Sequence, residues 1–252
     1  MNVQLLRNAS LVLTVNGKTI LVDPFFAPKE AYDAFDFTGN SRRNPLVDLP
    51  LGEQQLNELV AATDAVLLTH IHLDHWDAQA IALLSKDIPV FCQPDNEQTI
   101  AAQGFTAVTA IIDELTWQGI KISRTGGRHG TGAIGEKMGI VSGYVVNDGT
   151  GSVYIAGDTI WCEEVKDALD KYHPEKIIVN GGAARFIQGD PIVMDIPDII
   201  QVCNHAPAAM VYVVHLEAVN HATESRRDIL QALIGQQLND RCLIPEDGAF
   251  LF

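Results

Sequence analysis

Leu67-Leu68-Thr69-His70-Ile71-His72-Leu73-Asp74-His75-Trp76-Asp77 is the stretch that most strongly indicates the fold and chemistry of this protein. It follows an apolar strand and precedes an amphipathic segment, so its polar residues lie in a strand-to-helix turn. Residues i and i+2 of an extended segment point the same way, so His70 and His72 converge on one point. Asp74 and His75 then turn toward a second point. Imidazole and carboxylate bind Zn, Fe and Mn, so the stretch offers two ligand sets.

Chance is a poor explanation of this spacing. With 8 His in 252 residues, a shuffled chain would contain His-X-His-X-Asp-His with a probability of roughly one in a thousand or less. An ordinary cluster of histidines is the alternative interpretation. Three imidazoles at one strand end would repel one another when protonated and would lack partners when buried without metal. The pattern therefore predicts a metal centre.

Three more polar residues follow predicted strands. Strand 120–125 continues into a glycine-flanked His129, strand 152–156 into Gly157 and then Asp158, and strand 210–214 ends at His215. Ligands of open α/β sheets bind at the carboxyl ends of strands, and the glycines allow a close approach of the backbone. Each residue alone is weak evidence, but together with residues 70–75 they predict further metal ligands.

The order of elements predicts the architecture. Short apolar runs alternate with amphipathic stretches, which is typical of an α/β protein. Each half of the chain begins with strands and continues with strand–helix alternation. We therefore expect two sheets face to face with helices outside, a four-layer α/β/β/α sandwich. No linker or repeat interrupts the sequence, so residues 1–252 are predicted to form a single domain.

Several local elements can be predicted with their boundaries. Asn16-Gly17 predicts a tight hairpin turn, and Asp77 is a plausible N-cap for a helix over 77–86. We expect strands at 65–69, 140–147 and 152–156, the last two forming a hairpin, and a helix at 224–237. Substrate specificity is expected to lie in three loops, at residues 28–50, 130–138 and 182–195.

Composition restricts the class of protein. The net charge is −15, from 17 basic and 32 acidic residues, and such a field repels nucleic acids. The longest apolar run, 208–214, is far too short to cross a membrane. The N-terminus lacks the pattern of a secretory signal, and the four cysteines form no C-X-X-C motif. We expect a cytoplasmic protein with a small-molecule substrate, no nucleic-acid or membrane partner, and a possible homo-oligomeric state.

These motifs resemble the metallo-β-lactamase superfamily. The resemblance covers residues 65–215 and rests on the box at 70–75, the glycine-flanked His129, Gly157-Asp158-Thr159 and the strand-terminal His215. The residues in and around the motif at 70–75, together with Leu21-Val22-Asp23-Pro24, are most similar to the branch of the superfamily that contains ascorbate-6-phosphate lactonase and related hydrolases.

The resemblance implies a ligand assignment. One metal would take His70, His72 and His129, the other Asp74, His75 and His215, and Asp158 would bridge them together with a hydroxide. That hydroxide would be the nucleophile, and Asp74 is the catalytic candidate for passing a proton to the leaving group. Two divalent ions are expected, Zn first, with Mn or Fe as alternatives.

Four further residues are weaker candidates for substrate binding or for supporting the ligands. Asp23 ends a strand and would orient a ligand imidazole, although stabilising the turn before Pro24 is an equal alternative. His221 would contact substrate or support a ligand, with an ordinary loop histidine as the alternative. Arg185 follows a strand end and would bind an anionic group of the substrate; the alternative interpretation is an ion pair on the surface. Trp161 would form part of the pocket wall; the alternative interpretation is that it packs in the core.

The expected function is metal-dependent hydrolysis of an ester, lactone, amide or phosphoester of a small molecule. His72 favours this function, because related diiron redox proteins carry Glu at that position. A mononuclear-iron oxidoreductase acting on sulfur substrates is the first alternative. An RNA-processing nuclease is less favoured because of the −15 charge. A degenerate binding protein is disfavoured because no ligand position is lost.

Overall fold

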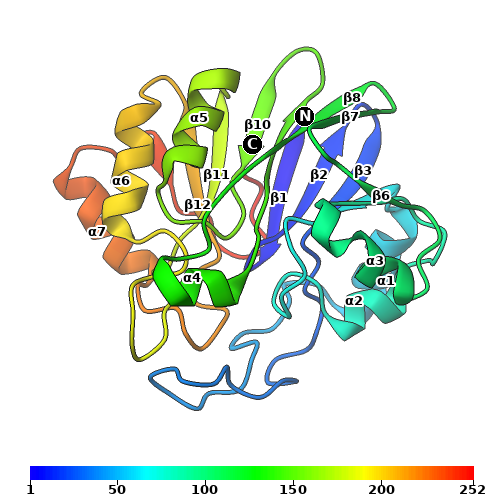
Figure 1. Ribbon diagram of the computed structural model, residues 1–252, viewed down its shortest axis with the longest axis horizontal. Helices are drawn as coiled ribbons and strands as arrows, with labels where there is room; N and C mark the ends of the chain where they lie inside the picture. Colours follow the sequence, from blue (N-terminus) through cyan, green and yellow to red (C-terminus); the bar gives the residue numbers. More distant parts are fainter.

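A computed structural model describes residues 1–252 and shows two mixed β-sheets packed face to face (Figure 1). The first sheet has the strand order β1-β2-β3-β4-β5-β6, and the second has the order β13-β12-β11-β10-β9-β8-β7. The strands are β1 Asn2–Arg7, β2 Ser10–Val15, β3 Lys18–Val22, β4 Ala65–Leu67, β5 Val90–Cys92, β6 Val108–Ala110, β7 Glu114–Trp117, β8 Ile120–Thr125, β9 Gly143–Asn147, β10 Ser152–Ile155, β11 Lys176–Asn180, β12 Met210–Val214 and β13 Cys242–Leu243.

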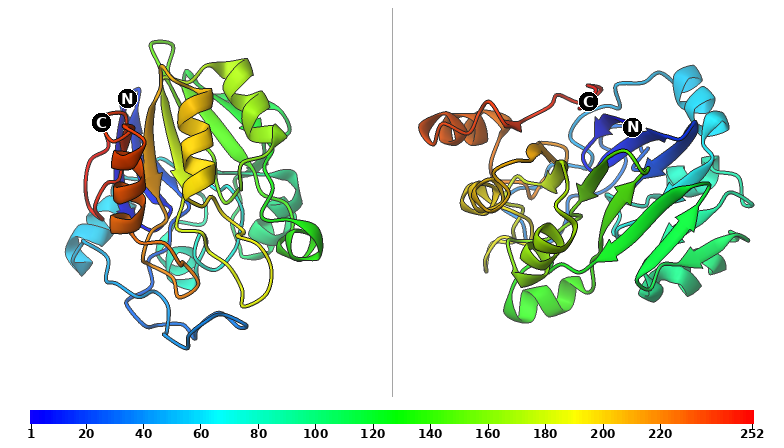
Figure 2. Two further views of the ribbon diagram at one scale, coloured as in Figure 1. Left: turned by 90° about the vertical axis from the view of Figure 1, so that its left-hand side faces the viewer. Right: turned by 90° about the horizontal axis from the view of Figure 1, so that it is seen from above.

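Helices cover both outer faces. The helices are α1 Glu53–Ala62, α2 Ala78–Leu83, the 3-10 helix η1 Pro94–Asn96, α3 Glu97–Ala102, α4 Gly132–Met138, α5 Glu163–Tyr172, α6 Ile196–His205 and α7 Arg226–Gly235. Figure 1 shows α1, α2 and α3 beside one sheet and α5, α6 and α7 beside the other, and Figure 2 shows the same layers from two further sides. Helices α1–α3 pack on the first sheet and α5–α7 on the second. The predicted four-layer sandwich is confirmed.

The alternation of side chains along the strands explains the three large apolar clusters, one between the sheets and one under the helices of each sheet. In β3, Ile20 and Val22 face the second sheet, while Leu21 packs under the helices of its own sheet. In β12, Tyr212 faces inward and Val213 packs under α5–α7. These two strands thus have two apolar faces, because both sheets are covered on both sides. None of the helices combines the length and apolar character that crossing a bilayer requires.

Local predictions hold where turn chemistry is specific. Asn16 and Gly17 have φ values of 50° and 71°, as the tight turn between β2 and β3 requires. Asp77 caps α2 and accepts a hydrogen bond from Ala80 N. Strands β9 and β10 form the expected antiparallel hairpin.

Other boundaries differ from the prediction for physical reasons. Strand β4 ends at Leu67, before the expected Thr69, whose N–H donates to the side chain of Asp23 instead of to a neighbouring strand. Helix α2 ends at Leu83 rather than 86, since Leu84 is extended. Helix α7 begins after Ser225, whose side chain forms a capping box with Asp228.

The segment 130–138, expected to be a loop, contains helix α4. Its glycines lower the intrinsic helix propensity, so the local pattern favours a loop. Gly135 is nevertheless required by packing, because a Cβ there would lie 2.7 Å from Gly130 O. The 28–50 segment contains no regular element apart from a bridge between Tyr32 and Asn44, as predicted.

Candidate metal centre

The predicted ligands come together from four strand ends. They follow β4, β8, β10 and β12, and they form two groups in which the donor atoms lie within 4.8 Å of one another. Strands β8, β10 and β12 run in the same direction, so their carboxyl ends share one edge of the second sheet. One group contains His70, His72 and His129, and the other contains Asp74, His75, Asp158 and His215.

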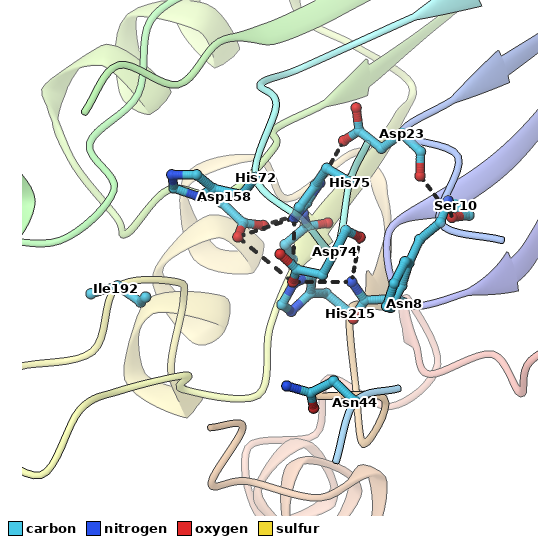
Figure 3. A network of polar contacts seen from close by, with 12 residues as sticks. Asn8, Ser10, Asp23, Asn44, His72, Asp74, His75, Asp158, Ile192 and His215 are labelled. Atoms are coloured by element: carbon cyan, nitrogen blue, oxygen red, sulfur yellow. Dashed lines mark hydrogen bonds and ion pairs between the residues drawn. The ribbon is translucent and has the colours of Figure 1, made fainter. Parts of the chain in front are cut away.

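Asp158 connects the two groups (Figure 3). Its Oδ2 lies 3.2 Å from His75 Nε2 and 3.7 Å from His215 Nε2 on one side. The same oxygen lies 3.6 Å from His129 Nε2 and 4.0 Å from His70 Nε2 on the other. One carboxylate oxygen therefore faces donors of both groups, which is the geometry required of a bridging ligand.

The donor set fits metal ions. His70 Nε2 is buried and has no hydrogen-bond partner, and buried polar atoms without a partner are unfavourable. His129 Nε2 lies 3.2 Å from His72 Nδ1, so two ring nitrogens face each other. A cation in each group would accept these lone pairs. Nitrogen and carboxylate donors in these numbers suit Zn and similar divalent ions.

Charges in the centre compensate one another. Burial alone would lower the pKa of His75, but the carboxylates of Asp158, Asp74 and Asp23 raise this pKa well above its usual value. Burial and the neighbouring His75 hold the pKa of His70 well below its usual value. The buried carboxylates thus favour positive charge at this position, which a divalent cation would supply.

Contacts behind the ligands orient the rings. Asp23 Oδ2 lies 2.9 Å from His75 Nδ1 and accepts a hydrogen bond from Thr69 Oγ1 at 2.6 Å. Thr69 Oγ1 also lies 3.0 Å from His70 Nδ1, so one carboxylate supports two imidazoles. His129 Nδ1 is 2.7 Å from the Ile192 carbonyl, to which it donates when its Nε2 is free to bind metal.

The backbone is strained at three positions around the centre. Asn8, Asp23 and His215 have φ values of 59°, 45° and 67°, although none is glycine. Such conformations cost about 1–3 kcal/mol each and persist where the surrounding structure enforces them. Here His215 N donates to Asn8 O at 2.8 Å, and Asn8 Nδ2 donates to Asp74 O at 3.1 Å. The strain places these side chains around the metal centre.

A cavity of about 290 Å³ opens onto the centre, and we call it the reaction cavity. Its wall combines metal-centre residues with apolar side chains and His221, which was a weak candidate from the sequence. Burial lowers the pKa of His221 to about 4, and Phe35 packs edge-on against its ring at 4.8 Å. The wall consists of Phe35, Asp36, Phe37, His72, Leu73, Asp74, His129, Lys137, Met138, Asp158, Phe186 and His221.

Comparison with known proteins agrees with this geometry. Residues 18–216 match the family model described as a beta-lactamase superfamily domain. The chain belongs to the metallo-β-lactamase superfamily. The resemblance predicted from the box is thereby confirmed at the level of the superfamily, while the narrower lactonase branch stays a prediction.

Relatives within the superfamily match over nearly the whole chain. The UPF0173 protein YddR of Bacillus subtilis (strain 168) is 36% identical, covering 98% of each chain. A possible metal-dependent hydrolase from Veillonella parvula DSM 2008 is 36% identical, with a TM-score of 0.94, covering 100% of this chain and 98% of that one. An isothiocyanate hydrolase from Delia radicum gut bacteria is 33% identical, with a TM-score of 0.93, covering 100% and 99%.

Two weaker candidates lie away from the reaction cavity of this superfamily member. Trp161 was expected to wall the pocket, but it packs on the outer helical layer, with its ring 5.4 Å from that of His205. The turn after Asp158 carries Trp161 over the outside of the second sheet. Arg185 Nε donates to Ala183 O at 3.3 Å, and Arg185 N donates to His221 O at 3.0 Å. Arg185 thus supports the loop that carries His221 and does not line the cavity.

Sequence reasoning missed three asparagines that support the centre. Asn180 Nδ2 donates to Asp158 Oδ1 at 2.6 Å, which orients the other oxygen toward the ligand groups. Asn8 Nδ2 lies 3.3 Å from Asp74 Oδ2. The sequence feature that could have identified Asn180 is its position at the end of a strand. For Asn8, that feature is its position in a tight turn between two strands. The third, Asn220, had no signal beyond its position next to His221.

Asn220 holds the 28–50 loop over the reaction cavity. Its Oδ1 accepts hydrogen bonds from Phe35 N at 3.0 Å and from Asn44 Nδ2 at 2.9 Å. Its Nδ2 donates to Thr38 Oγ1 at 2.6 Å, and its main-chain oxygen accepts from Asn40 Nδ2 at 2.8 Å. One buried side chain thus fixes the loop residue that packs on His221.

We expect Asn220→Ala to release this loop. Losing its buried hydrogen bonds should lower the free energy of unfolding by about 2–4 kcal/mol and speed hydrogen exchange in residues 28–50. KM should rise more than kcat falls, since the metal ligands are untouched. Asn239→Ala, which removes one exposed hydrogen bond to Asp240, is the control. Unchanged exchange in residues 28–50 would show that other contacts hold the loop.

Proposed function

We propose that this protein is a metal-dependent hydrolase that attacks an electrophilic carbon of a small molecule, with two divalent ions in its centre. The observation that carries the proposal is the position of Asp158 Oδ2, within 4.0 Å of imidazole nitrogens of both ligand groups. A lone metal ion would need only one group. The relatives named as hydrolases, which match over the whole chain, support the same class of reaction.

The candidate ligands are divided between the two proposed metal ions. His70, His72 and His129 would hold one ion, Asp74, His75 and His215 the other, and Asp158 both. When bound, such a pair lowers the pKa of water toward neutrality and polarises the bond to be hydrolysed. Zn is the expected ion because the donors are imidazoles and carboxylates, and Mn or Fe would suit the same donors.

Asp74 is the proposed proton carrier. It lines the reaction cavity, and its Oδ2 lies 3.1 Å from His215 Nε2. Burial opposes its ionisation, but His75 and His215 hold its pKa well below the usual value, so the carboxylate is ionised. Its place in the cavity wall would let it receive a proton from the attacking water and pass it to the leaving atom.

The wall of the reaction cavity favours carbon over phosphorus as the reacting centre. Apart from the proposed metal ions, Lys137 is the one Lys or Arg of the wall, and Asp36 is also present, so a phosphate dianion would find little compensation from side chains. Among carbon electrophiles we place isothiocyanates first, since a full-length relative is named for them, and lactones second. In the balanced reaction, R–N=C=S and H₂O give R–NH₂ and O=C=S. The water oxygen bonds to carbon, the C–N bond breaks, and nitrogen receives the protons.

The test is a substrate panel with the metal content determined. We expect about two ions per chain by elemental analysis, and turnover of 2-phenylethyl isothiocyanate or a γ-lactone well above that of bis(4-nitrophenyl) phosphate. Turnover of the phosphodiester alone would contradict attack on carbon. A single iron per chain with oxygen consumption would favour the mononuclear-iron oxidoreductase instead. RNA binding at moderate salt is expected to be undetectable, because of the −15 charge.

A further inference from the structure

A second, more apolar cavity adjoins the reaction cavity. It has a volume of about 410 Å³ and we call it the tail chamber. It shares Phe37, Lys137 and Phe186 with the reaction cavity, so the two cavities lie side by side, and the reaction cavity reaches the metal centre. The chamber is lined by Phe37, Ile134, Lys137, Phe186, Ile187 and Gln188.

Three segments far apart in the sequence build this chamber. Phe37 comes from the 28–50 loop, Ile134 from α4, and Phe186 and Ile187 from the loop after β11. Ile187 N donates to Phe37 O at 2.8 Å, which joins two of the segments across the chamber. Gly189 lets the third segment, helix α4, approach the loop after β11, because a Cβ at Gly189 would lie 2.1 Å from Ile134 Cδ1. The chamber is therefore a feature of the tertiary structure and not of any one loop.

The chamber leaves apolar side chains in water. Phe37 and Ile187 are 73% and 72% exposed, among the most exposed large apolar residues of the chain. Exposed apolar surface gathered around a cavity is typical of a ligand site. A ligand that covered it would gain the free energy of removing this surface from water.

The charge of the chamber limits the ligand further. Lys137 is the only charged residue in its wall, and its Nζ lies 5.9 Å from the centre of the Phe37 ring. A single cation above an aromatic ring tolerates an apolar or aromatic group. A polyanion would require several donors that the wall does not contain.

We propose that the substrate carries an aryl or medium-length alkyl tail that lies in the tail chamber while its reactive carbon lies at the metal centre. This inference rests on the proposed function. The shared wall of the two cavities favours this occupant, because a substrate whose reactive carbon lies in the reaction cavity can extend its tail past Phe37 and Phe186 into the chamber. Ile187 is then a specificity-determining residue that never touches the reacting atoms.

The experiment uses the metal-loaded enzyme and isothiocyanates from methyl through hexyl, with the 2-phenylethyl compound added. Each buried methylene should raise kcat/KM by up to about fourfold until the chamber is full. Ile187→Ser should lower kcat/KM for hexyl at least about fivefold and leave methyl within about twofold. Ile112→Ser is the matched control, since Ile112 is 68% exposed and lies outside both cavities.

The outcomes separate this inference from the function on which it rests. A rising series that Ile187→Ser flattens and Ile112→Ser leaves unchanged supports the tail chamber. Turnover without dependence on tail length, or equal effects of the two variants, overturns the chamber and leaves the hydrolase intact. No turnover of any member by enzyme with both ions bound overturns isothiocyanate hydrolysis and this inference together.

Discussion

Asp158→Ala is expected to lower the metal content from about two ions per chain to one or none, and to reduce hydrolysis by about 1,000-fold or more. The physical reason is the position of one oxygen, which lies within 4.0 Å of imidazole nitrogens in both ligand groups. Without it, each group loses an anionic donor, and two cations held close together would repel each other with less negative charge between them. Elemental analysis and steady-state kinetics on the same preparation measure both effects.

Asp170→Ala provides the control for this prediction. Asp170 also pairs with a histidine, at 2.8 Å from His205 Nε2, but on the exposed outer helices. Its loss should leave metal content and kinetics unchanged. An Asp158→Ala enzyme with two ions and full activity would refute the bridging role, whatever the fold of the variant.

Asp23→Asn is expected to weaken metal binding by about 10-fold to 100-fold without removing a ligand. Asp23 accepts hydrogen bonds from Thr69 N at 2.8 Å and Thr69 Oγ1 at 2.6 Å, and it lies 2.9 Å from His75 Nδ1. An amide is a weaker acceptor, and its NH₂ would face these donors. His75 and, through Thr69, His70 would then lose their fixed orientation. Competition with a chromophoric chelator measures the affinity.

Asp77→Asn separates this positioning role from a merely structural one. Asp77 is as deeply buried as Asp23 and accepts hydrogen bonds from Phe26 N, Ala27 N and Ala80 N, but it touches no ligand side chain. Both variants should be destabilised, by about 1–3 kcal/mol, and only Asp23→Asn should lose metal affinity. Equal metal affinities in the two variants would argue that Asp23 serves the fold alone.

The metal centre was predictable from the sequence because its geometry is local at each ligand. His70 and His72 share a face through the two-residue repeat of extended chain, and the turn before α2 redirects Asp74 and His75. His129, Asp158 and His215 were found because each follows an apolar strand, and neighbouring strands that run in the same direction end at one edge. The same periodicity predicted two sheets with covered faces.

The residues that support the ligands were not predictable in this way. Asn180 reaches Asp158 across 22 positions, and Asn220 joins the 28–50 loop to the loop after β12 across more than 170 positions. Such contacts depend on how loops pack, and no periodic signal records that. Trp161 shows the converse error, because closeness to Asp158 in sequence did not bring it to the cavity.

Strand and turn patterns in the chain thus specify the layers, the order of elements and the seven candidate ligands, since these follow from short-range backbone geometry repeated along the sequence. The tail chamber, the helix at 132–138 and the hydrogen bonds around Asn220 arise only when distant segments meet. At Gly135 and Gly189 the missing side chain permits an approach that local propensity does not reveal. Long-range packing decides such features because their energies come from contacts between segments and not from any segment alone.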